Sequence, residues 1–81
     1  MRVRVLFFAR ARELAGLSEA DLEIPSGTNV AAAVRHLAEA FPGLASYLQV
    51  CRLAVDEELA DSGDPIREGA VLAVIPPVSG G

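Results

Sequence analysis

Apolar and polar residues alternate along the first stretch of the chain, a pattern typical of a β-strand. Over residues 2–8, Val3, Val5 and Phe7 fall on one face. A second alternating stretch covers residues 20–24 and ends at a Pro-Ser-Gly turn. The opposite face of the first strand carries both charged and apolar side chains, namely Arg2, Arg4, Leu6 and Phe8.

After that turn the apolar spacing lengthens to three or four residues, which predicts one long helix. Thr28 or Asn29 is suited to accept hydrogen bonds from the free amides of its first turn, and Pro42-Gly43 ends it. A shorter helical turn over residues 9–15 stops at Gly16. The side chains expected to face the core from the long helix are Val30, Val34, Leu37, Ala38 and Phe41.

Two more strands are expected after a loop through Tyr47, over residues 51–55 and 70–75, with a short strand near Leu59. The order strand, strand, helix, strand, strand predicts an α+β domain, with one mixed sheet packed on one main helix. The first and last strands are the most apolar, so we expect them side by side at the centre. A β-grasp fold satisfies this order, whereas a ferredoxin-like fold needs a second long helix. We place the domain at residues 1–75 and an extended tail at 76–81.

Composition narrows the range of partners. The 81 residues leave room for one domain, and the net charge of −4 disfavours nucleic acid and favours a basic protein surface. All seven basic residues are arginine. The single cysteine, Cys51, fits a reducing compartment, no apolar run reaches the roughly 18 residues of a membrane span, and no secretory cleavage pattern is present. We therefore expect a cytoplasmic location and no membrane partner.

Candidate chemistry within the folded part is sparse. Neither glycine-rich phosphate-binding pattern occurs, so no nucleotide cofactor is expected on this chain. His36 has no companion for a metal site, and Cys51 has no evident base to activate it. The carboxylates between residues 56 and 68 lack calcium-loop spacing, so we interpret them as a solvated turn region that also suits a basic partner. We expect no metal site and no catalytic residues in the domain itself.

The end of the sequence is more informative. Pro76 and Pro77 favour an extended exit from the last strand, and six residues can reach about 20 Å. Gly80 and Gly81 have no side chains, so backbone and carboxylate can thread a narrow channel. An ordinary frayed end or a truncation is the alternative explanation. The distinctive group that such a tail presents is the α-carboxylate of Gly81.

An exposed apolar patch is expected where this tail begins. If Leu72 and Val74 point into the core, the other residues of the last strand share the outer face of the sheet with the first strand. One helix covers only one face, so that patch is expected to be a protein interface. Its predicted members are Leu6, Phe8, Val71, Ala73 and Ile75, with Leu59 nearby.

Several motifs together resemble the small subunit of molybdopterin synthase, a ubiquitin-like family. The resemblance covers essentially the whole chain, and the IPPVSGG ending is its most specific part. The motifs are VLFFARARELAG at 5–16, FPGL at 41–44, LAVDEEL at 53–59, Arg67-Glu68-Gly69 and VLAVIPPVSGG at 71–81.

This resemblance implies a sulfur carrier in molybdenum cofactor biosynthesis. An E1-like enzyme would adenylate Gly81 with ATP, a persulfide donor would convert it to a thiocarboxylate, and the sulfur would pass to a pterin precursor in the large subunit. The tail entering that subunit would comprise Pro76, Pro77, Val78, Ser79, Gly80 and Gly81. The resemblance also assigns Phe8, Leu59, Ile75 and Arg12 to the partner interface and implies a hetero-tetramer, with the chain as its non-catalytic subunit.

Other functions stay open at this point. Similar carriers serve thiamine, cysteine or thiolated-tRNA pathways. A ubiquitin-like protein modifier is also compatible with the tail, although a chain without lysine cannot build isopeptide-linked chains on itself. A third possibility is a β-grasp binding module whose tail is inert.

Overall fold

The computed structural model describes residues 1–77, and within them the strands and the long helix follow one another in the predicted order. Each alternating stretch has become a strand, and the periodic stretch has become the longest helix. The elements are β1 (Arg2–Phe7), α1 (Ala9–Ala15), β2 (Glu19–Glu23), α2 (Val30–Ala40), the 3-10 turn η1 (Pro42–Leu44), α3 (Ala45–Leu48), β3 (Arg52–Val55), β4 (Glu58–Leu59) and β5 (Val71–Ile75).

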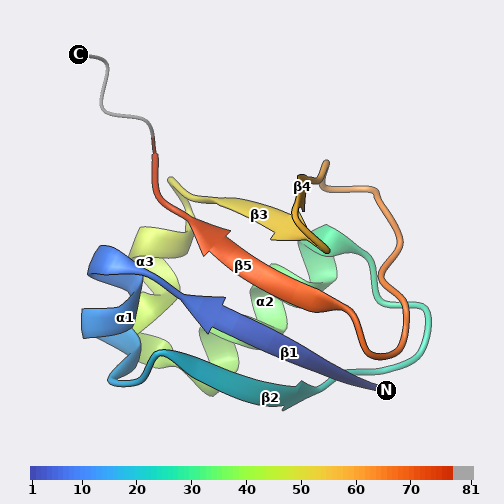
Figure 1. Ribbon diagram of the computed structural model, residues 1–81, viewed down its shortest axis with the longest axis horizontal. Coiled ribbons are helices and arrows are strands. Elements are labelled where there is room, and N and C mark those ends of the chain that lie inside the picture. The colour runs from blue at the N-terminus through green and yellow to red at the C-terminus, as the bar shows by residue number, and fades with distance from the viewer. Residues whose placement is uncertain (78–81) are drawn as a thin grey trace.

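The five strands form one mixed sheet in the order β2-β1-β5-β3-β4 (Figure 1). β1 and β5 run parallel, from the pair Arg4–Val71 to the pair Phe7–Val74, and the other pairs are antiparallel. The prediction that the first and last strands lie side by side is therefore confirmed. β5 lies at the centre of the sheet, so its carboxyl end carries the chain out from the middle of the fold.

The core lies between the sheet and the helices, which cover a single face of the sheet (Figure 1). Val3, Val5 and Phe7 of β1 are almost fully buried, as are Leu72 and Val74 of β5. Alternation in both strands thus directs one apolar set toward the helices. From α2 the buried residues are Val30, Ala33 and Leu37.

Sequence reasoning missed some details of the helical layer. Ala33 lies in the core, whereas Val34, Ala38 and Phe41 are only partly buried around it. Even so, the ring of Phe41 packs edge-to-face on Phe7, with 5.2 Å between centroids. Ala33 is fully buried although its side chain is small, so burial at this helix does not follow side-chain size.

The structure shows which residue begins α2 and how α1 ends. Asn29 is the N-cap of α2, because its side-chain oxygen accepts from the Ala32 N–H at 2.9 Å. The Thr28 hydroxyl instead donates to the carbonyl of Pro25. Gly16 ends α1 with a φ of 81°, in the left-handed region that glycine adopts freely.

The segment between α2 and β3 is not the plain loop that the sequence suggested. It forms η1 and α3, which bury Leu44 and Leu48 against the core. These two leucines are one helical turn apart, but a helix of four residues is too short to show a repeating pattern. The prediction of a loop here was wrong for that reason.

The ends of β1 and β5 determine where Phe8 and the start of the tail lie. β1 stops at Phe7, so Phe8 leaves the strand and caps α1 instead of extending the sheet as predicted. β5 stops at Ile75, and Pro76 and Pro77 follow outside regular structure. Among residues 1–77, no helix combines the length and apolarity that a membrane span requires.

Candidate docking face and tail root

A row of apolar residues crosses the sheet on the face away from the helices. Directly paired residues of neighbouring strands point to the same face. Leu6 of β1 pairs with Ala73 of β5, and Ala73 pairs with Ala54 of β3. Ala54 in turn pairs with Leu59 of β4. Four strands thus contribute one side chain each to a continuous row.

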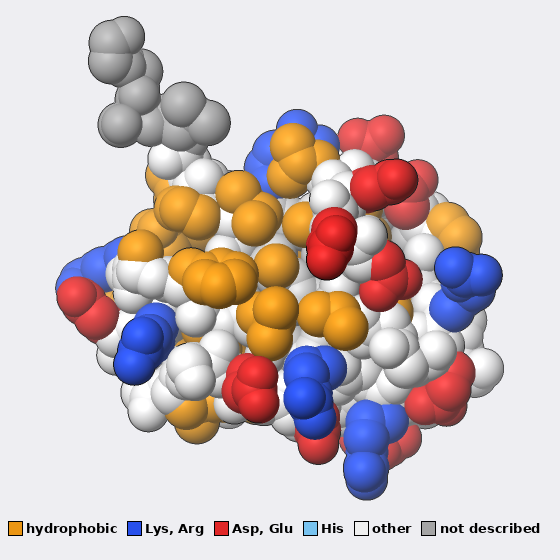
Figure 2. Space-filling view, in the orientation of Figure 1, with side chains coloured by type: hydrophobic (Ala, Val, Ile, Leu, Met, Phe, Trp, Pro, Cys, Tyr) orange, Lys and Arg blue, Asp and Glu red, His pale blue; other side chains and the backbone are white. Residues whose placement is uncertain are grey.

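We call this row, together with Phe8, Val71 and Ile75, the docking face. Figure 2 shows it as a field of hydrophobic side chains extending toward the start of the tail. Phe8 is 48% exposed and Leu59 is 56% exposed, although large apolar side chains are usually covered in a monomer. Of the predicted patch, Phe8 and Leu59 are exposed, whereas Leu6, Val71, Ala73 and Ile75 are half-buried. Whether the patch is an interface is a separate question.

Ala54 is a member of the docking face that sequence reasoning missed. It is only 7% exposed because it lies between Ala73 and Leu59 in the row. The alternation in residues 52–55 carries the signal, since Leu53 faces the core and its neighbour must face outward. Ala54 thus joins Ala73 to Leu59 in the row with a small side chain.

Paired charges border the face on the side of β2. Arg4 lies 3.5 Å from Asp21 and 3.8 Å from Glu19, and Arg2 lies 3.7 Å from Glu23. All of these side chains are more than half exposed, so each pair contributes no more than about 1 kcal/mol. Their effect is to neutralise the arginines of β1, which leaves that border without strong net charge.

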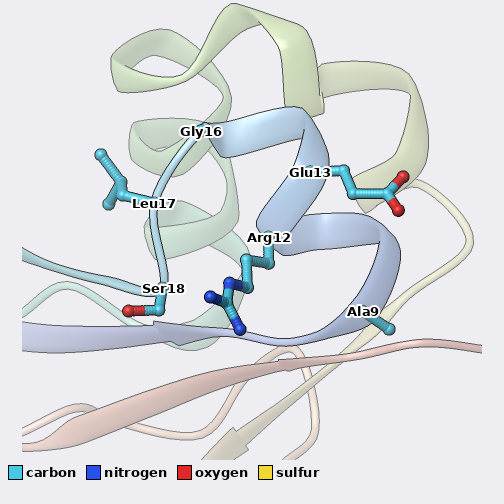
Figure 3. A pocket seen from close by; sticks show the side chains of 6 residues that line it. All are labelled: Ala9, Arg12, Glu13, Gly16, Leu17 and Ser18. Carbon is cyan, nitrogen blue, oxygen red and sulfur yellow. The ribbon is translucent and has the colours of Figure 1, made fainter.

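Arg12 lies one helical turn after Phe8 and lines an open pocket of about 570 Å³ with Leu17 and Ser18 (Figure 3). Its guanidinium forms no ion pair with any carboxylate of residues 1–77, and the neighbouring Glu13 pairs with Arg10 at 3.1 Å. An unpaired arginine beside an exposed apolar surface suits a carboxylate on another molecule.

The tail root is adjacent to the docking face. Ile75 ends β5 and is half-buried, Pro76 is half-buried and Pro77 is exposed. Proline fixes φ and lacks an N–H, so these two residues neither continue the β-ladder nor begin a helix. The remaining tail residues of the predicted site, Val78, Ser79, Gly80 and Gly81, lie outside the described residues.

Within residues 1–77, the chemically reactive side chains do not assemble into a site. Burial raises the pKa of the Cys51 thiol, although a hydrogen bond with Tyr47 acts in the opposite direction. No three histidine, cysteine or carboxylate side chains of that range are grouped to hold a metal ion. What this part of the chain presents is an apolar surface, a free guanidinium and an extended exit from the sheet.

The mixed sheet over one long helix, with its apolar outer face beside the last strand, defines a β-grasp domain of the ubiquitin type. Sequence comparison assigns the chain to a narrower family within this class. The chain belongs to the ThiS family, whose model matches residues 5–81, and is related within it to the molybdopterin synthase sulfur carrier subunits.

Individual relatives agree with this placement. The molybdopterin synthase sulfur carrier subunit of Chlamydomonas reinhardtii is 34% identical over 83 residues, covering 100% of both chains. The crystal structure of SAMP1 from Haloferax volcanii superposes with a TM-score of 0.89 at 27% identity, covering 100% of both chains. A complex of subunits 1 and 2 of the molybdopterin-converting factor from Helicobacter pylori contains a chain with a TM-score of 0.71 and 27% identity, again with full coverage.

Proposed function

We propose that this protein is the sulfur carrier subunit of a molybdopterin synthase. The observation that carries the proposal is the apolar docking face, which adjoins the end of β5 where the tail begins. Full-length similarity to sulfur carrier subunits supports it, as does the two-subunit complex from Helicobacter pylori. In this proposal the folded domain binds partners and the tail carries the reacting atom.

The reaction proposed for the tail takes place at the carboxylate of Gly81. A carboxylate resists nucleophilic attack, so an E1-like enzyme first joins it to AMP from ATP and releases pyrophosphate. A persulfide sulfur then attacks the carbonyl carbon, and the C–O bond to AMP breaks with the electron pair leaving on AMP. Reductive cleavage of the S–S bond by a thiol leaves a thiocarboxylate on Gly81. ATP belongs to the activating enzyme, and no cofactor is proposed on this chain.

The docking face would direct that thiocarboxylate into the large subunit, where a pterin precursor accepts the sulfur. Phe8, Leu59 and Ile75 would lose their exposed apolar surface to the partner, which is favourable by about 25 cal/mol per Å². Arg12 would pair with a carboxylate of the partner. Pro76 and Pro77 would hold the start of the tail extended, and Val78, Ser79 and Gly80 would enter the channel ahead of Gly81.

Intact mass spectrometry tests the chemical step. After incubation with the activating enzyme, ATP and a sulfur source, the chain should gain about 16 Da at Gly81, since sulfur replaces oxygen. Omission of ATP is the control for non-enzymatic sulfur addition. No mass gain with an activating enzyme that thiolates a known carrier in parallel would rule the proposal out.

Related sulfur carriers and protein modifiers are the competing assignments. Carriers for thiamine, cysteine or tRNA thiolation would show the same mass gain, so growth of a strain lacking its own molybdopterin carrier separates them. A modifier function is suggested by the fold shared with SAMP1, a small archaeal modifier protein. It predicts covalent adducts of high mass in cell extract that persist in thiol reductants. Rescue of the strain without such adducts supports the synthase.

A further inference from the structure

The turn between β3 and β4 holds two consecutive non-glycine residues in the left-handed region. Asp56 has a φ of 49° and Glu57 has a φ of 73°. Positive φ at both positions is the geometry of a type I′ hairpin turn, which favours asparagine, aspartate and glycine. Glutamate is not among the favoured residues, so the turn is strained at Glu57. A hydrogen bond from outside the hairpin would offset this strain.

Asp56 supplies such a contact by binding β5 twice. Its backbone N–H donates to the carbonyl oxygen of Val71 at 2.9 Å, and its carboxylate Oδ1 accepts from the Val71 N–H at 2.9 Å. The last ordinary pair between the two strands is Val55 with Leu72. Because β3 turns away beyond that pair, the carboxylate takes the place of a strand carbonyl and extends the ladder by one residue.

This turn matters because it determines where β4 lies. β4 has only two residues, and its pairs with β3 are Val55–Glu58 and Ala54–Leu59. A strand so short has few contacts of its own to fix its position. Leu59 is the outer end of the docking-face row, so a shift of the hairpin moves an apolar side chain that the partner would contact.

We propose that Asp56 is a positioning residue for docking, and that it acts through Leu59. Its carboxylate fixes the turn against β5 and thereby keeps Leu59 in line with Ala54 and Ala73. The inference rests on the proposed function, because it assumes that the docking face binds the large subunit.

A matched pair of variants isolates the hydrogen bond. Asp56→Gly keeps the left-handed conformation but removes the acceptor, whereas Asp56→Asn keeps an acceptor oxygen and tolerates the same φ. In the free chain, hydrogen exchange at the Val71 amide should be faster in Asp56→Gly than in Asp56→Asn. Asp56→Ser, with a shorter neutral acceptor, should fall between them and serves if the glycine variant is too unstable to assay. Equal exchange rates in all variants would overturn the inference. Because the free chain is measured, this result does not depend on binding to the large subunit.

A double-mutant cycle then connects the hydrogen bond to docking. The affinity for the purified large subunit should fall roughly fivefold in Asp56→Gly, the scale of one hydrogen bond, and stay near normal in Asp56→Asn. In a Leu59→Ala background, Asp56→Gly should change the affinity by less than about twofold. An equal loss of affinity in both backgrounds, or no loss at all, would overturn the positioning role of Asp56 but leave the proposed function intact. If Leu59→Ala itself leaves the affinity unchanged, the docking face proposed above is wrong.

Discussion

Gly43 shows how one residue controls the contact between η1 and α1. A Cβ added at this position would lie 3.0 Å from the carbonyl oxygen of Leu14, which belongs to the backbone and moves little. Gly43→Ala should therefore lower the free energy of unfolding by about 1–3 kcal/mol, the usual cost of overpacking. Urea unfolding measures this difference.

Gly63→Ala is the matched control for that substitution. Nothing lies within 4 Å of an added Cβ at Gly63, and its φ is not positive. Alanine there reduces the entropy of the unfolded chain without a clash, so stability should stay the same or rise slightly. If both variants lose the same free energy, the close approach at Leu14 is not the cause.

Cys51 is the one thiol in a protein proposed to carry sulfur, and it should take no part in the transfer. Burial raises the pKa of this thiol, so less reactive thiolate is present near neutral pH. Iodoacetamide at pH 8 should alkylate the folded chain more slowly than the urea-unfolded chain. Cys51→Ala should retain full sulfur transfer. Loss of transfer in this variant would place the sulfur, at least transiently, on the side chain.

At the scale of elements, β5 has one face in the core and one in the docking face. Ala73→Glu would place a carboxylate in the middle of the outer row, where partner binding would bury it. Because burying an unpaired charge is costly, the affinity for the large subunit should fall at least about tenfold. The free chain should keep its circular dichroism spectrum, since Ala73 does not face the core.

Ala40→Glu is the control for added charge. Ala40 ends α2 and is exposed on the helical side of the sheet, away from the docking face. Isothermal titration calorimetry should show nearly normal affinity for this variant. Equal weakening by both substitutions would indicate a general effect of net charge and argue against docking through the outer face.

The elements were predictable where their residues repeat a local pattern. Two strands with alternating side chains and an eleven-residue helix contain enough repeats to reveal their periods. The four residues of α3 do not. Leu44 and Leu48 are buried where α2 contacts η1 and α3, and where α1 contacts η1. Phe8 was also predicted wrongly. It continues the alternation of the first strand, but in the structure it is the N-cap of α1.

At the scale of the whole molecule, binding and chemistry should separate. The docking face belongs to the folded sheet, whereas Gly80 and Gly81 belong to the tail. Deletion of these two glycines should abolish sulfur transfer completely, because the accepting carboxylate no longer reaches its site. Binding to the large subunit should only weaken, and titration of the truncated chain measures this. Retained transfer would show that the tail is inert and that the domain is a binding module.

The sequence by itself determined which residues of the first and last strands face the core, where the long helix lies and which motifs identify the family. Alternation, periodicity and motifs are properties of neighbours along the chain, so a local pattern contains them. Tertiary structure alone decided which residues stand opposite one another. The row from Leu6 through Ala73 and Ala54 to Leu59 joins four strands, and the bond from Asp56 to Val71 spans fifteen residues. Strand order and register depend on the packing of the entire sheet against its helices, so no local pattern contains them.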